Sequence, residues 1–258
     1  MKADTSNTNP NTREAWNAAF AEDGSWRLNL GRDQTRRFAE CFHKHVRVPI
    51  TGKFSVLDVG CALGDSLPVW RKHYPEAELH GTDVSEVAIE QARELHGAIA
   101  TFTRASFDEI TGIYDVIFCS NVLEHFEEHV AIARKLLAHC RYLYVLTPYA
   151  EWDEIGRPLV PTPNQQHVAT FFLDTFDSLR QDDFARIDTK IVRCPIAWSP
   201  SLKGEIGWHL RYFLGRISTP SPPRRQIIYT ITATHAGTRW EWSRRRPGDN
   251  STLFRPLD

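Results

Sequence analysis

The sequence predicts an α/β fold, with an open sheet of about seven mostly parallel strands, helices on both faces, an N-terminal helical segment and an inserted cap. Short apolar runs that end at a glycine or proline alternate with stretches of helical periodicity, which is the rhythm of strand–helix–strand units. Most of these runs are largely apolar, as expected for parallel strands covered by helices on both faces. A length of 258 residues, 41% hydrophobic and 24% charged, accommodates one large domain of this kind.

The first elements follow in a regular order. Residues 32–48 carry apolar side chains at three- and four-residue spacings, which predicts an amphipathic helix. Strands are predicted at 54–59, 77–82, 99–103, 114–119 and 141–147. Helices are predicted between them at 65–74, 86–96 and 127–139. Ser85 is the expected N-cap of the helix at 86–96, which ends at Gly97.

The pattern loosens after Pro148. A proline-rich loop is predicted at residues 149–166, followed by a helix at 172–181 and a strand at 183–193. An irregular insertion at 194–225 leads to a last, β-branched strand at 226–234. Residues 1–50 are assigned to an N-terminal tail and helical cap, and residues 51–258 to the main domain. Long irregular segments in compact domains are usually functional, so the N-terminal segment and residues 149–225 are expected to cover the site.

Composition excludes several classes of protein. The formal net charge of −1 gives no overall field that would attract nucleic acid or an anionic membrane. No run reaches the roughly 18 apolar residues that span a bilayer, and the polar N-terminus lacks a signal-peptide pattern. The five cysteines form no C-x-x-C pair and no metal-binding cluster is visible. We expect a cytoplasmic protein without a membrane span. No metal site is predicted, although an isolated acidic pair could still hold magnesium, and the sequence leaves open whether a general base or a metal is used.

The most informative stretch is the turn after the first predicted strand. This strand ends in Asp58-Val-Gly60, and the chain turns through Gly64 into a helix, whose N-terminus offers free N–H groups. Asp83 follows Gly64 by about 20 residues, the spacing at which an acidic side chain reaches ribose hydroxyls in nucleotide-binding units. The third glycine of the dinucleotide pattern is missing, which favours a ribose-bearing cofactor without a pyrophosphate.

Three segments together resemble the class I, Rossmann-like S-adenosylmethionine-dependent methyltransferases: DVGCALGD, GTDVS and YDVIFCSNVLEHF. The resemblance covers roughly residues 54–148. It implies S-adenosylmethionine as the cofactor and methyl transfer as the reaction. The binding residues that it implies are Asp58, Gly60, Cys61, Ala62 and Gly64 for the methionine moiety, Asp83 for the ribose, Val84, Ser106 and Phe107 for the adenine, and Asn121 beside the transfer channel.

Methyl transfer from a sulfonium needs proximity, alignment and exclusion of water. An oxygen acceptor usually also needs a general base, most often a histidine. His167, at the end of the proline-rich loop, is the preferred candidate, and His125, just past the fourth strand, is the second. Glu124 is interpreted as a charge at a helix end.

The acceptor is predicted to be a small molecule or an intermediate of a glycan or lipid pathway, methylated on oxygen. The SNVLEHF segment resembles small-molecule methyltransferases, and the Asn/Asp-Pro-Pro-aromatic tetrad of some amino-group methyltransferases is absent. Three alternatives stay open: an RNA or protein methyltransferase that uses the arginines at 244–246, a cofactor-binding protein without turnover, and a nicotinamide dehydrogenase. Trp152, Trp198 and Trp208 line the acceptor pocket or form the small core of a lid. The oligomeric state is undetermined.

Overall fold

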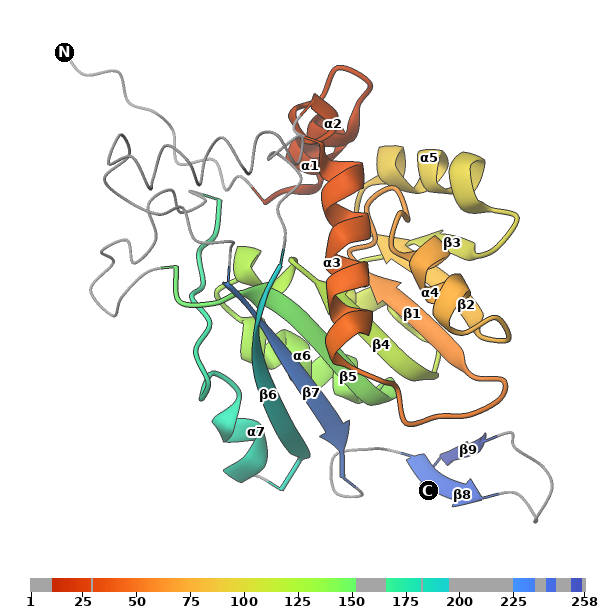
Figure 1. Cartoon of the computed structure of the whole chain (residues 1–258), viewed down its shortest axis with the longest axis vertical. Coiled ribbons are helices and arrows are strands. Elements are labelled where there is room, and N and C mark those ends of the chain that lie inside the picture. The colour runs from red at the N-terminus through yellow and green to blue at the C-terminus, as the bar shows by residue number, and fades with distance from the viewer. Residues whose placement is uncertain are drawn as a thin grey trace.

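The computed structural model describes residues 11–28, 30–151, 166–181, 183–194, 225–234, 240–244 and 252–256. Within these ranges the chain forms a seven-stranded, mostly parallel sheet of the Rossmann-like type, in the order β3-β2-β1-β4-β5-β7-β6 (Figure 1). Only β7 runs against its neighbours, because it pairs antiparallel with both β5 and β6. The predicted fold class is therefore confirmed.

The strands agree closely with the apolar runs of the sequence. They are β1 (Ser55–Val59), β2 (Glu78–Asp83), β3 (Thr101–Arg104), β4 (Tyr114–Ser120), β5 (Cys140–Pro148), β6 (Ala185–Arg193) and β7 (Arg225–Ala233). Residues 226–234 were expected to be the last strand, which is wrong: β8 (Trp240–Arg244) and β9 (Thr252–Pro256) follow and pair with each other. Trp240-Glu-Trp242 alternates apolar and charged residues as a strand does, but over only three residues beside an arginine-rich segment.

The helices frame this sheet. They are α1 (Arg13–Phe20), α2 (Ser25–Leu28), α3 (Gly31–His45), α4 (Leu67–His73), α5 (Glu86–His96), α6 (His129–Leu137) and α7 (Asp177–Gln181), with short 3₁₀ turns η1 (Phe107–Glu109) and η2 (Leu123–His125). Ser85 caps α5 by accepting a hydrogen bond from the Ala88 N–H, and Gly97 is its C-cap, as predicted. None of the described helices has the length and apolarity that a membrane crossing needs.

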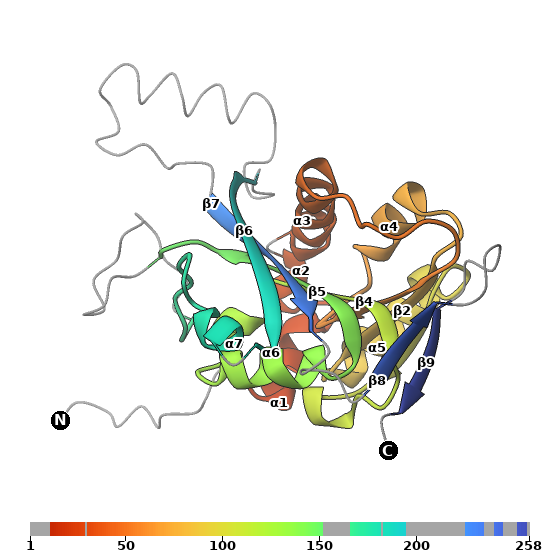
Figure 2. The same ribbon diagram turned by 90° about the horizontal axis from the view of Figure 1, so that it is seen from below.

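The core forms one layer on each face of the sheet. Successive strand residues point to opposite faces, so Val56 and Phe118 join one cluster while Leu57 and Ile117 join the other. Helices α3, α4 and α5 supply the first cluster, and α6 and α7 supply the second (Figures 1 and 2). The central strands are buried on both faces, which explains their continuous apolar sequence.

Candidate functional site

A cavity of about 980 Å³ lies at the carboxyl ends of the parallel strands. Chain order reverses between β1 and β4 in this sheet, and such switch points are where open α/β sheets bind ligands. Residues that follow β1, β2, β3 and β4 line the cavity, and residues of α1, α2 and α3 line it from the N-terminal segment. The cavity is therefore built jointly by the sheet edge and the N-terminal helices.

The glycine turn after β1 has a backbone that other residues tolerate poorly. Gly60 and Gly64 adopt φ of +71° and +80°. A Cβ on Gly60 would lie 2.4 Å from a methyl group of Val122, and one on Gly64 would lie 2.8 Å from the Phe102 ring. Both the dihedral angle and the space therefore require glycine. The Gly60 N–H donates to the Thr82 carbonyl at 2.8 Å, which holds the turn against β2.

Two buried carboxylates hold the turn in place. Asp58 accepts a short hydrogen bond from the Ser66 hydroxyl. Asp83 accepts the Ala62 and Ser85 N–H groups at 2.9 Å each. Burial raises the pKa of Asp58 to about 7, opposed by the Ser66 hydrogen bond and assisted by the charge of Asp83. Burial also raises the pKa of Asp83, against three backbone hydrogen bonds that lower it.

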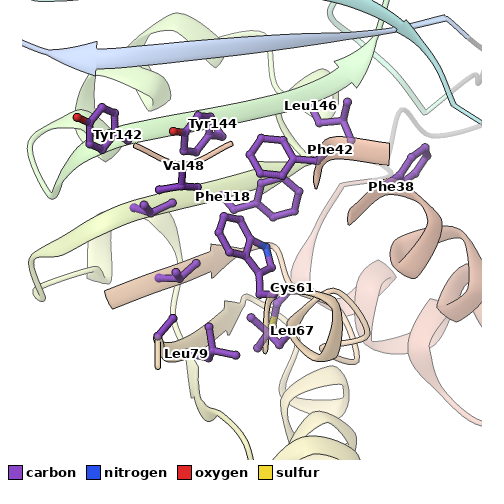
Figure 3. Packing of buried hydrophobic residues seen from close by; sticks show 14 of the residues in the cluster. Phe38, Phe42, Val48, Cys61, Leu67, Leu79, Phe118, Tyr142, Tyr144 and Leu146 are labelled. Carbon is purple, nitrogen blue, oxygen red and sulfur yellow. The ribbon is translucent and has the colours of Figure 1, made fainter. Parts of the chain in front are cut away.

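Most residues implied by the resemblance line this one cavity. They are Asp58, Gly60, Ala62, Asp83, Val84, Ser106, Phe107 and Asn121. Cys61 differs, because its side chain belongs to the core cluster beside Leu67 (Figure 3), and burial raises the pKa of its thiol well above the ordinary value. Gly64 directs its Cα hydrogen toward the Phe102 ring, so its contribution is the shape of the turn.

Both predicted histidines line the same cavity, in a buried cluster with Glu124. The Nδ1 atom of His125 lies 3.2 Å from the Gln166 carbonyl, and Nδ1 of His167 forms a short hydrogen bond with the Glu151 carboxylate. The Nε2 atom of His167 lies 3.9 Å from Oε1 of Glu124. The two imidazole rings meet edge to face, with centroids 5.0 Å apart.

Glu124 is buried, with 1% of its surface exposed, although the sequence suggested a solvated charge at a helix end. Its Oε2 accepts the Thr147 hydroxyl at 3.0 Å. Burial raises the pKa of Glu124 to about 7, and the nearby His167 opposes the shift. Burial lowers the pKa of His125 to about 4, and His167 adds to that shift. The site therefore contains three interacting ionisable groups instead of a single histidine.

Two contributors had no sequence signal. Trp16 of α1 lines the cavity and packs edge to face on His125, with centroids 5.2 Å apart. Glu151 belongs to the proline-rich stretch at 149–166, whose sequence gives no sign that this carboxylate contacts a histidine. Three tryptophans that the sequence singled out lie outside the described residues: Trp152, Trp198 and Trp208. The same is true of residues 195–224 of the expected insertion and of the arginines at 245–246.

Comparisons with known proteins agree with this geometry. A sequence profile described as a methyltransferase domain matches residues 57–142. Trans-aconitate 2-methyltransferase of Methylobacterium nodulans is 28% identical over 116 residues, which are 44% of this chain and 43% of that enzyme. The aligned part thus spans less than half of the curated relative.

Solved structures share the fold. A chain from the complex of the Haloferax volcanii Trm112 methyltransferase activator with a methyltransferase has a TM-score of 0.58 and 14% identity, over 85% of this chain and 98% of its own. The plantazolicin methyltransferase BpumL, in complex with a pentazolic desmethylPZN analogue and SAH, has a TM-score of 0.52 and 19% identity. The match covers 86% of this chain and 97% of BpumL. Magnesium protoporphyrin IX methyltransferase of Synechocystis PCC 6803, with bound SAH, has a TM-score of 0.51 and 15% identity. The match covers 80% of this chain and 85% of that enzyme.

Proposed function

We propose that this protein is an S-adenosylmethionine-dependent methyltransferase that methylates an oxygen of a small molecule or of a glycan- or lipid-pathway intermediate. The match of residues 57–142 to a methyltransferase-domain profile and the fold shared with methyltransferases that bind SAH support this proposal. The observation that carries the proposal is a single cavity that combines the glycine turn and Asp83 with an imidazole–carboxylate cluster. Its volume of about 980 Å³ lies at the upper end of the usual range of ligand pockets, which leaves room for a cofactor and a small acceptor.

The cofactor is proposed to lie along the carboxyl ends of β1 to β4. Its methionine moiety would lie against the Gly60–Gly64 turn, where the carboxylate of Asp58 faces the cavity close to the cationic groups of the cofactor. Asp83 would accept the ribose hydroxyls. The adenine would lie among Val84, Ser106 and Phe107, and Phe107 is held in place by an edge-to-face contact with Phe126 at 5.1 Å. Asn121 would border the path of the methyl group.

The acceptor is proposed to bind on the side of the cavity lined by Glu124, His125 and His167. An acceptor oxygen attacks the methyl carbon in line with the C–S bond, whose electron pair returns to sulfur. The protein supplies proximity and alignment for this step and excludes water from it. The hydroxyl proton is lost at the imidazole–carboxylate cluster, which agrees with the assignment of His167 and His125 as catalytic residues.

Calorimetric titration with S-adenosylmethionine, S-adenosylhomocysteine and NAD tests the cofactor. We expect micromolar binding of the first two and none of NAD. An acceptor screen with methyl-labelled cofactor then separates small-molecule extracts from protein and RNA fractions. Label in a small molecule, located on an oxygen atom by mass spectrometry and NMR, supports the proposal. Label in RNA or protein favours that alternative, and cofactor binding without any labelled product favours a binding protein. The cytoplasmic location stays a prediction.

A further inference from the structure

The cluster of Glu124, His125 and His167 has the composition of a metal centre. Each residue offers one ligand atom, and these atoms lie within 4.8 Å of one another. Bonds of about 2.0–2.2 Å to a tetrahedral metal place ligand atoms roughly 3.4 Å apart, so rotations of the side chains by about 1 Å would close the site. Two imidazoles and one carboxylate form a donor set that suits divalent first-row transition ions better than magnesium.

The groups around the two imidazoles match those that surround ligating histidines. A ligating histidine usually donates its second ring N–H to a carboxylate or a backbone carbonyl, which sets its tautomer and orientation. Nδ1 of His167 faces the Glu151 carboxylate, and Nδ1 of His125 faces the Gln166 carbonyl. If Nδ1 is the donor in both rings, Nε2 carries the lone pair that a metal ion would bind.

Glu124 supplies an independent observation. Its Oε1 atom is buried and has no hydrogen-bond partner among the residues that the structure describes. The same atom lies 3.9 Å from Nε2 of His167, and the residue lines the cavity. An unsatisfied buried carboxylate oxygen costs free energy, and a bound cation would remove that cost.

We propose that Glu124, His125 and His167 bind one divalent transition-metal ion, such as Zn²⁺, at the acceptor side of the cavity. Three protein ligands leave at least one position open, as in catalytic zinc sites, and the acceptor oxygen occupies it. This inference deepens the function proposed above and rests on it.

The ion gives the cluster a defined chemical role. Binding of the acceptor R–OH to the ion would lower the pKa of its hydroxyl, so that His125 and His167 act as metal ligands instead of general bases and the proton leaves to solvent. The oxygen then uses a lone pair to bond the methyl carbon while the C–S electron pair returns to sulfur. The products are R–O–CH₃, S-adenosylhomocysteine and one proton. Acceptors with a second oxygen next to the hydroxyl would chelate the ion and are expected to react best.

Cobalt binding to the full-length, chelator-treated protein tests the site directly. We expect one Co²⁺ per chain with visible d–d absorption, displaced by Zn²⁺. Because the chain has 11 histidines, His139→Gln serves as the matched control for unspecific binding. His125→Ala, His167→Ala and Glu124→Gln should each weaken binding at least 100-fold. Glu151→Gln, which removes only the partner of His167, should weaken it about 10- to 100-fold.

S-adenosylmethionine titrations on the same samples check that each variant is folded. If a variant does not fold, the number of Co²⁺ ions bound per wild-type chain still tests the proposal. Failure to bind one equivalent of Co²⁺ or Zn²⁺, or equal losses in His139→Gln and His167→Ala, would overturn the metal site. Methyl transfer that persists in full without metal would overturn its role but leave the proposed function standing. Metal binding without methylation of any oxygen acceptor would count against the proposed function instead.

Discussion

At the scale of single residues, Asp58 is a buried carboxylate in the part of the cavity where the cofactor is proposed to bind. Burial raises its pKa to about 7, whereas in the unfolded chain it titrates near 4. Between about pH 4 and pH 7, Asp58 is therefore protonated in the folded state but ionised in the unfolded chain. Its contribution to the free energy of unfolding falls as pH rises through this range. A bound sulfonium would favour the ionised form and expel the proton.

We therefore expect affinity for S-adenosylmethionine to rise between pH 5.5 and 7.0, by up to about tenfold per pH unit. Calorimetry in two buffers of different ionisation enthalpy measures the proton released on binding. Asp58→Asn should remove the part of the pH dependence that belongs to this residue. If the affinity for S-adenosylmethionine changes with pH equally in the wild type and in Asp58→Asn, the Asp58 carboxylate is not the origin of the pH dependence.

Asp83 has a structural role, because its two oxygens accept backbone N–H groups from Ala62 and Ser85. The proposed contact with the ribose hydroxyls would be a second role. Asp83→Ala should weaken cofactor binding by about 1–3 kcal/mol and also lower the melting temperature. Asp83→Asn keeps one acceptor and should lose less on both measures. A loss of stability with unchanged cofactor affinity would limit Asp83 to a structural role.

At the scale of elements, α1 is the part of the N-terminal segment that closes the cavity. Trp16 packs on His125, and the Asn11 side chain donates to the His125 carbonyl at 3.0 Å. The Gln91 side chain of α5 donates to the Phe20 carbonyl at 2.9 Å, so α1 is also attached to the main domain. Arg32 of α3 adds an ion pair with Asp65 of the turn at 2.8 Å.

Trp16→Ala should weaken binding of S-adenosylmethionine by about 1 kcal/mol, or roughly fivefold, because the cavity loses an aromatic wall and its edge-to-face contact. Turnover should fall further, since His125 loses a packing partner. Arg13→Ala, on the exposed side of the same helix, should change neither. Comparable losses in both variants would mean that α1 acts only through its overall stability.

At the scale of the whole molecule, the N-terminal cap and the sheet share one core. Phe42 of α3 packs beside Phe118 of β4 and Tyr144 of β5 (Figure 3). Its ring centroid is 5.0 Å from each of theirs and 5.5 Å from that of Trp70 of α4. The division at residue 50 therefore crosses a packed interface. We propose that residues 1–50 and the rest unfold together.

Phe42→Ala should lower the free energy of unfolding by about 3–5 kcal/mol, the usual cost of deleting a buried aromatic ring. Urea unfolding followed by both fluorescence and circular dichroism should show a single, shifted transition. Lys44→Ala, exposed on the same helix, is the control. Two separate transitions would show that the cap is an independent domain.

Much of the architecture could be predicted from short stretches of sequence. Apolar runs such as residues 114–119 are strands because the sheet buries both faces, and Ser85 and Gly97 bound α5 through local capping. The turn at Gly60 and Gly64 was equally predictable, since left-handed dihedrals depend on the residue itself. The predicted helix at 32–48 agrees with α3. Trp16, Ala19 and Phe20 of α1 repeat the same three- and four-residue spacing, but over only eight residues, and α1 was not predicted as a separate helix.

The imidazole–carboxylate cluster depended instead on tertiary structure. Glu124 and His167 are 43 positions apart, and nothing near Glu124 in the sequence indicates that its carboxylate is buried beside an imidazole. The same holds for Trp16 on His125 and for Glu151 on His167. Dihedral preference and periodicity are local properties that a sequence displays, whereas burial and charge pairing arise only when distant segments pack and exclude water.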